Sequence, residues 1–139
     1  MRCMHAIRIA STLALAFSLG ACASLYKPAC ADGSHPAIQD SLYFGTNKPN
    51  GAVTPDEWTA FLETTVTRRF PQGLTVLQAS GQWRGAGGSI VHEPSHVLQL
   101  VHPDDASSEE SIAEIIATYK VQFKQESVLR VKTAACVSF

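Results

Sequence analysis

The sequence predicts an α+β domain of the ferredoxin-like class, with elements in the order β-α-β-β-α-β. Three observations lead there: two helix-capping sequences, strand-like segments before and after them, and a glycine-rich turn that joins the two middle strands. Such a chain forms a four-stranded antiparallel sheet with two helices on one face. With 139 residues, 45% of them hydrophobic and 17% charged, the chain has the size and composition of a single folded domain.

The first strand and the first helix are marked by turn and cap signals. Ser41–Thr46 (SLYFGT) is rich in aromatic residues and precedes NKPNG, which indicates a strand and then a turn. Thr54–Glu57 (TPDE) is a capping box with proline at the first helical position, so a helix is expected to begin there. Trp58 and Phe61 have the spacing of one buried helix face, and the helix should end before Pro71.

The two middle strands are predicted to form a hairpin. Leu74–Arg84 alternates in polarity, which is typical of a half-buried strand. Gly85–Gly88 supplies the turn, and the next strand is expected over Ser89–Val101. The expected core-facing residues of the first of these strands are Leu77, Ala79, Gly81 and Trp83, and its expected outer residues are Gln78, Ser80, Gln82 and Arg84.

The second helix and the last strand complete the pattern. Ser107–Glu110 (SSEE) is a second capping box, which predicts a helix start. An apolar stripe follows it at Ile112, Ile115, Ile116, Tyr119 and Phe123. Ser127–Thr133 (SVLRVKT) is expected to be the fourth strand.

The N-terminus has the features of a secretory signal over residues 1–21, with a weakly basic start, an apolar run and small residues before a cleavage site. LGAC at Leu19–Cys22 resembles a lipobox, in which cleavage before Cys22 leaves that cysteine to carry a lipid. ACA at Ala21–Ala23 would instead suit ordinary signal peptidase and leave a soluble periplasmic product. The lipoprotein alternative is favoured, which would attach the protein to a membrane by lipid alone.

The expected mature chain is mildly acidic. Removing residues 1–21 leaves nine basic and twelve acidic groups, a net charge of −3 with histidine neutral. This balance argues against nucleic-acid binding, which requires a basic patch. Residues 22–39 lack periodicity and are expected to be a lipid-attachment and tether segment, so that the folded domain spans residues 40–139. The expected location is the periplasm, with anchoring to the outer membrane of a Gram-negative bacterium.

Two cysteines, Cys30 and Cys136, remain after the signal and the lipid site are assigned. In an oxidising compartment an even remainder favours a disulfide. The last strand of a ferredoxin-like sheet lies beside the first, which would bring these two residues together. Two unpaired thiols are the alternative.

HEPSHVLQLVH at His92–His102 fits the zinc-protease pattern H-E-x-x-H in its first five residues. That site needs a helix, so that two imidazoles lie one turn apart on one metal, and Pro94 disfavours a helix there. In a strand, His92 and His96 would lie about 13 Å apart, too far to share one metal easily. We therefore expect a strand, with neither a metal nor a cofactor.

A polar cluster around Glu93 is the main functional candidate. Glu93 is expected beside Arg84 on the outer face of the hairpin, with other polar groups nearby and Arg130 approaching from the last strand. Such a cluster could be a small-ligand site, a dimer surface or structural ion pairing. The candidate ligand or interaction residues are Glu93, Arg84, Ser95, Tyr43, Gln82 and Glu126, and no catalytic residue is assigned.

The segment from Leu42 to Phe139 resembles a bacterial secreted family known as domain of unknown function 3574. The motifs that carry the resemblance are Y-F-G at residues 43–45, W-x-x-F at 58–61, R-F-P-x-G-x-T at 69–75, G-x-W at 81–83, E-x-S at 93–95 and Q-E-S-V-L-R at 125–130. The resemblance implies a small exported protein, often lipid-anchored, and it brings no assigned activity.

Two functional hypotheses follow. The favoured one is a non-enzymatic envelope protein, anchored through Cys22, whose domain binds an envelope partner or a second copy of itself through the open face of the sheet. The alternative is a small periplasmic enzyme or ligand-binding protein that uses Glu93, Arg84 and neighbouring polar groups. A concave pocket with both charges unpaired would favour the alternative, whereas a flat face with the charges paired to each other would favour the first.

Overall fold

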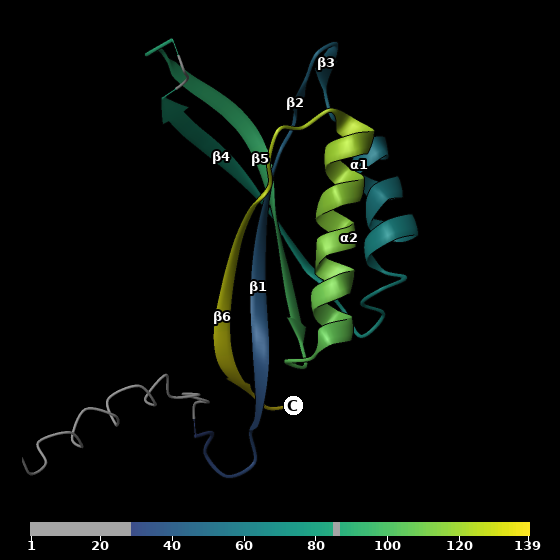
Figure 1. Cartoon of the computed structure of the whole chain (residues 1–139), viewed down its shortest axis with the longest axis vertical. Coiled ribbons are helices and arrows are strands. Elements are labelled where there is room, and N and C mark those ends of the chain that lie inside the picture. The colour runs from purple at the N-terminus through teal and green to yellow at the C-terminus, as the bar shows by residue number, and fades with distance from the viewer. Residues whose placement is uncertain (1–28, 85–86) are drawn as a thin grey trace, which may run out of the picture.

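The computed structural model describes residues 29–84 and 87–139. Its sheet has the antiparallel strand order β4-β5-β1-β6, and the helices lie on one face of it (Figure 1). This arrangement confirms the predicted ferredoxin-like α+β fold. The elements are β1 (His35–Gly45), β2 (Asn47–Lys48), β3 (Gly51–Ala52), α1 (Pro55–Phe61), the π-helical turn η1 (Leu62–Val66), β4 (Thr75–Arg84), β5 (Ile90–His102), α2 (Ala106–Phe123) and β6 (Leu129–Val137).

Helix α1 begins where its capping box predicts. The hydroxyl of Thr54 accepts from the backbone N–H of Glu57, and the Glu57 carboxylate accepts from the backbone N–H of Thr54. The helix buries Trp58 and Phe61 against the sheet and then widens into η1. The aromatic core is built from both helices and β1, since Phe44, Phe61 and Tyr119 lie edge to face with one another.

The N-cap of helix α2 lies two residues before the predicted cap. The N-cap is Asp105, whose carboxylate accepts from the backbone N–H of Ser108 at 2.7 Å, so the predicted Ser107 cap is wrong. A carboxylate is both a hydrogen-bond acceptor and a negative charge at the positive end of the helix dipole. The third helical position is Ser108 and not a glutamate, so the predicted capping box does not form, and Glu109 binds Arg130 and Lys132 of β6.

Strand β1 begins at His35, so the ordered domain starts before the expected boundary at residue 40. The cause is the length of β6, which continues to Val137 and pairs with β1 along its whole length, from Tyr43↔Leu129 to His35↔Val137. Cys30 and Cys136 form a disulfide with their Cα atoms 5.5 Å apart, which confirms the predicted bridge. The bridge holds the chain entering β1 against the end of β6.

The faces of β4 are opposite to those predicted. Leu77 and Trp83 are 47% and 46% exposed, whereas Val76 packs against the core. Cross-strand partners share a face, and Val76 pairs with the buried Leu98 of β5. The far halves of β4 and β5 also run beyond the helices, which leaves both of their faces uncovered there (Figure 1).

The predicted signal (residues 1–21) and Cys22 lie outside the described residues, as does the first part of the predicted tether. No helix within residues 29–84 and 87–139 has both the length and the apolar character needed to cross a membrane.

Candidate functional site

A pocket of about 700 Å³ opens on the sheet face away from the helices, at the end where β1 finishes and β6 begins. Five of the six predicted site residues line it, which brings together segments from four parts of the chain. Its polar and aromatic lining includes Tyr43, Asn47, Lys48, Gln82, Trp83, Glu93, Ser95, Gln125 and Glu126. The candidates Tyr43, Gln82, Glu93, Ser95 and Glu126 therefore share one site.

Arg84 is the sixth candidate, and it does not line this pocket. Its guanidinium donates to the backbone carbonyl of Gly88 at the hairpin turn, 3.3 Å away. The hairpin pairs Gly81 with Glu93 and Arg84 with Ile90, so Arg84 and Glu93 project from opposite faces. The expected cluster of Glu93 and Arg84 is thus wrong.

Glu93 forms a wall of the pocket and is only 7% exposed. Its Oε1 accepts from the backbone N–H of Asn47 at 2.5 Å. The strand is held at this point because the backbone N–H and hydroxyl of Thr46 both donate to the carbonyl of Pro94. Among the described residues no lysine, arginine or histidine forms an ion pair with Glu93.

Gly45 makes room for this carboxylate. A Cβ added at Gly45 would lie 2.7 Å from Oε2 of Glu93 and 2.8 Å from Oε1 and Cδ, closer than side chains pack. The Gly45 carbonyl accepts from the hydroxyl of Tyr119 at 2.8 Å. Burial raises the pKa of Tyr119, and the charges of Glu93 and Glu57 raise it further, so the phenol stays neutral and remains a donor.

The segment after β1 contributes to the pocket, although no sequence signal marks it as part of a site. NKPNG was read only as a turn, yet Asn47 and Lys48 line the pocket and Asn47 binds Glu93. The ammonium of Lys48 is held by the Glu57 carboxylate, which it contacts at 2.5 and 2.7 Å, and this contact lowers the pKa of Glu57. The side-chain amide of Gln125 donates to the Asn47 carbonyl and so links the α2–β6 loop to the same segment.

The model of the family described as "Protein of unknown function (DUF3574)" matches residues 39–139. The chain belongs to the DUF3574 family. No curated protein matches it. Four of the motifs named from the sequence, Y-F-G at 43–45, G-x-W at 81–83, E-x-S at 93–95 and Q-E-S-V-L-R at 125–130, each contribute residues that line the pocket of this DUF3574 chain.

Solved structures with a similar fold include two of a phage SAM lyase. One, in complex with S-methyl-5'-thioadenosine, has a TM-score of 0.55 and 15% sequence identity, and the match covers 84% of the DUF3574 chain and 97% of the other. The other, in the apo state, has a TM-score of 0.52 and 16% identity, with 77% and 91% covered. At these identities the likeness shows the fold alone.

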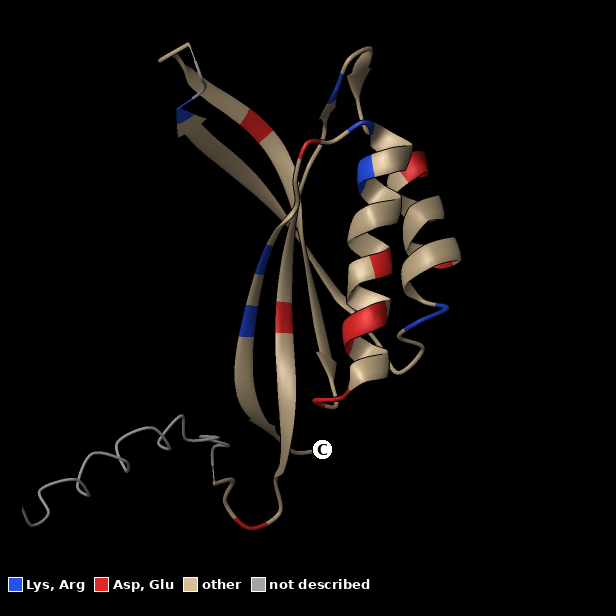
Figure 2. Ribbon diagram, in the orientation of Figure 1, with Lys and Arg blue, Asp and Glu red and all other residues tan. Residues whose placement is uncertain are grey.

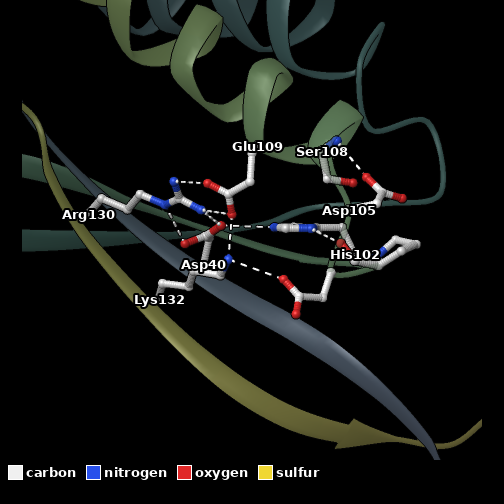
Figure 3. Close-up of polar contacts among 9 residues, drawn as sticks. Asp40, His102, Asp105, Ser108, Glu109, Arg130 and Lys132 are labelled. Carbon is white, nitrogen blue, oxygen red and sulfur yellow. Dashed lines mark hydrogen bonds and ion pairs between the residues drawn. The ribbon is translucent and has the colours of Figure 1, made fainter. Parts of the chain in front are cut away.

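A buried ionic cluster lies on the helix side of the sheet in the DUF3574 chain (Figure 3). Asp40 of β1 is fully buried and accepts two hydrogen bonds from Arg130, at 2.7 and 2.6 Å. His102 Nε2 lies 2.9 Å from the same carboxylate, and its Nδ1 lies 2.7 Å from the Pro103 carbonyl. The expected approach of Arg130 to Glu93 is therefore wrong, because Arg130 occupies the other face of the sheet.

The outer part of this cluster joins helix α2 to β6. Arg130 also binds Glu109 at 2.8 and 2.9 Å, and Lys132 binds it at 2.6 Å. The hydrogen bond from Arg130, and to a smaller extent that from Lys132, lowers the pKa of Glu109 to about 2. Hydrogen bonds to Asp40 and Glu109 raise the pKa of Arg130. Each charge of the cluster has an opposite partner, so we assign it a structural role.

The three histidines of the zinc-protease pattern lie on strand β5, as predicted, and not on a helix. His96 stacks on Trp58 with ring centroids 4.3 Å apart, and burial lowers its pKa. His102 belongs to the ionic cluster. In the part of the chain that the structure describes, no group of three or more His, Cys, Asp or Glu residues is placed to hold a metal ion.

Proposed function

We propose that the DUF3574 chain is an exported binding protein that holds a small molecule in the Glu93 pocket. The observation that carries the proposal is the Glu93 carboxylate, which is almost buried in the pocket wall and receives one hydrogen bond from the described residues. Burying a carboxylate without a cation costs free energy, and a group of this kind in a pocket is a candidate for a functional site. A ligand that supplies the missing partner would offset this cost.

The lining indicates what kind of molecule fits. Tyr43 and Trp83 offer exposed aromatic surface in the same pocket as the Glu93 carboxylate. Carboxylates with aromatic rings are suited to cationic groups, and aromatic rings also stack on flat heterocycles. Gln82 and Gln125 add amide groups. We infer a ligand with a positively charged or strongly donating group attached to a planar ring.

This pocket favours the ligand-binding hypothesis over binding through a flat charged face. The predicted discriminating feature is a concave pocket in which Glu93 and Arg84 are both unpaired. Glu93 lines such a pocket without an ion-pair partner among the described residues, whereas Arg84 does not line it. The volume of about 700 Å³ lies in the range of small-molecule pockets. The phage SAM lyase of similar fold holds S-methyl-5'-thioadenosine, which suggests adenosine derivatives as the first probes.

We expect S-adenosylmethionine (SAM) to bind at least tenfold more tightly than S-methyl-5'-thioadenosine, because the sulfur of SAM is a cation and that of the thioether is not. Replacing Glu93 by glutamine should weaken SAM binding about tenfold or more and abolish the preference, since a hydrogen bond or ion pair to a charged group contributes about 1.5–3 kcal/mol. Isothermal titration calorimetry with both compounds measures these affinities.

Two further variants sharpen this test. Gly45→Ala should weaken SAM binding in the same way, because the added methyl group displaces the Glu93 carboxylate. Glu63→Gln, a matched change on the exposed surface of η1, should leave binding unchanged. The proposed pocket fails as a site for such ligands when neither compound binds at millimolar concentration, or when Glu93→Gln binds SAM as well as the unchanged protein does.

We also propose that the protein is anchored in the bacterial envelope through a lipid on Cys22. The disulfide supports export to an oxidising compartment, and the LGAC sequence supports lipid attachment. Labelled palmitate fed to cells that express the protein is expected to enter it, and Cys22→Ser is expected to abolish the label. Equal labelling of both proteins, or labelling of neither, would contradict the anchor.

A further inference from the structure

The open face of the sheet carries almost no charge. Alternate residues of each strand face away from the helices, and the pairing places odd-numbered residues of all four strands on this side. Among them no lysine or arginine occurs, and the single carboxylate, Glu93, is almost buried. Asp40, Arg130 and Lys132, the charged residues of β1 and β6, are even-numbered and lie on the other face. Most of the other charged residues lie on the helices and loops (Figure 2).

This uncharged face exposes large apolar side chains on every strand. They are Tyr43 of β1, Leu77 and Trp83 of β4, Val101 of β5, and Leu129 and Val131 of β6, each at least 40% exposed. No described element covers them, because both helices lie on the opposite side (Figure 1). Leu77, Val97, Tyr43 and Leu129 are successive cross-strand partners, so the centre of this face is apolar across all four strands. An exposed apolar patch of this kind indicates an interaction site.

We propose that a second copy of the chain packs on this face, sheet against sheet, around a two-fold axis. A partner for this surface must itself be uncharged and apolar. A second copy of the chain carries the identical surface and is always present together with the first. Two sheets with the same twist pack face to face at about −30°. The pairing goes beyond the proposed ligand binding and does not depend on it.

The size of the face is sufficient for a stable dimer. The four strands are staggered and lie side by side only around Tyr43, Leu77, Val97 and Leu129, but at about 4.8 Å between strands and about 3.3 Å per residue, four strands of nine or more residues together present roughly 600 Å². For two copies that is about 1,200 Å² in total, which reaches the lower end of the standard range for specific interfaces. Interfaces of this kind have cores depleted of charge, as this face is.

The second copy would also close the ligand pocket. Tyr43, Trp83 and Leu129 belong both to the apolar face and to the pocket lining, so a partner seated on the face lies over the mouth of the pocket. A ligand bound beside Glu93 would then be enclosed between two copies, in a drier site where the carboxylate binds a cation more strongly.

Sedimentation equilibrium on the full-length protein tests the dimer, with Cys22→Ser to prevent a lipid from driving association. The protein is expected to sediment as a dimer at micromolar concentration. The double variant Leu129→Lys with Val131→Lys should raise the dimer dissociation constant at least a hundredfold, since it buries unpaired charges in the interface. Both side chains are exposed, at 60% and 44%, so the monomer should still fold.

Val121→Lys is the matched control, because Val121 is 72% exposed on α2, away from the open face, and its replacement should leave the dissociation constant unchanged. Circular dichroism verifies that all variants remain folded. A monomer at 200 μM, or a double variant that dimerises as well as the control, would overturn the proposal. Flotation with neutral phosphatidylcholine vesicles tests a lipid surface as the alternative partner. A monomer that binds these vesicles, and loses the binding in the Leu129→Lys with Val131→Lys variant, would also overturn the proposal.

Discussion

Replacing Asp40 by alanine is expected to lower the free energy of unfolding by about 3–5 kcal/mol, the typical cost of removing one partner of a buried ion pair. Asp40 is fully buried and binds Arg130 through both oxygens while also contacting His102. Its loss leaves Arg130 with Glu109 alone and leaves His102 Nε2 without its carboxylate partner. Urea denaturation followed by circular dichroism measures the change.

The control for this prediction is Lys132→Ala, which removes an ion pair with the same Glu109 at the exposed rim of the cluster. Lys132 is 38% exposed, so its removal should cost less than about 1 kcal/mol. The double variant Asp40→Ala with Arg130→Ala should lose less unfolding free energy than the sum of the losses of the two single variants. The second change removes the Arg130 charge that the first change leaves without its buried partner. Equal effects of Asp40→Ala and Lys132→Ala would mean that the buried pair stabilises the fold no more than the exposed pair does.

Local sequence signals were sufficient for the order of elements. The Thr54 capping box, the polarity alternation of β4 and the apolar stripe of α2 are properties of neighbouring residues, and each marks an element that the structure contains. Their ends were less accurate, because ends depend on distant partners. β1 starts at His35 because β6 extends far enough to pair with it.

The faces of strands and the partners of charges could not be predicted in the same way. Both faces of β4 mix small, apolar and polar residues, so its alternation shows the period without showing which side meets the helices; the pairing of Val76 with Leu98 decides it. Arg84 was consequently placed with Glu93 in error. Asp40 gathers His102 and Arg130 from 62 and 90 residues along the chain, and that contact depends on the register of three strands.

Most of the candidate pocket could nevertheless be predicted, for a physical reason. Glu93 and Ser95 are two residues apart on one strand, which places them on the same face in any sheet. Tyr43 joined them through the family motif, and β1 pairs Tyr43 with Val97, on that same face. Asn47 and Gln125 were not predicted to belong to the pocket. Asn47 binds Glu93 through its backbone N–H, and Gln125 lies in a loop and binds the Asn47 carbonyl, and neither contact follows from a periodic pattern in the sequence.

Removing the disulfide is expected to lower the free energy of unfolding by about 3–5 kcal/mol. Cys30 and Cys136 lie 106 residues apart, and in the chain-entropy model a cross-link over about 100 residues stabilises by about 4.7 kcal/mol, although measured bridges often contribute less. The double variant Cys30→Ser with Cys136→Ser removes the bridge without leaving a lone thiol. Urea denaturation of the oxidised protein and of this variant measures the loss.

The same experiment separates an effect on the unfolded chain from an effect on the native fold. Without the bridge the unfolded chain can expand and expose more surface, so the dependence of the unfolding free energy on urea should become steeper as the midpoint falls. The bridge lies at the end of β1 that is distant from Gly45 and the pocket. At urea concentrations below the unfolding midpoint, the variant should therefore bind SAM in the Glu93 pocket with unchanged affinity. Equal midpoints for the oxidised protein and the variant would show that the bridge contributes nothing to stability. A fall in ligand affinity in the folded variant would show instead that it holds the native sheet in shape as far as the pocket.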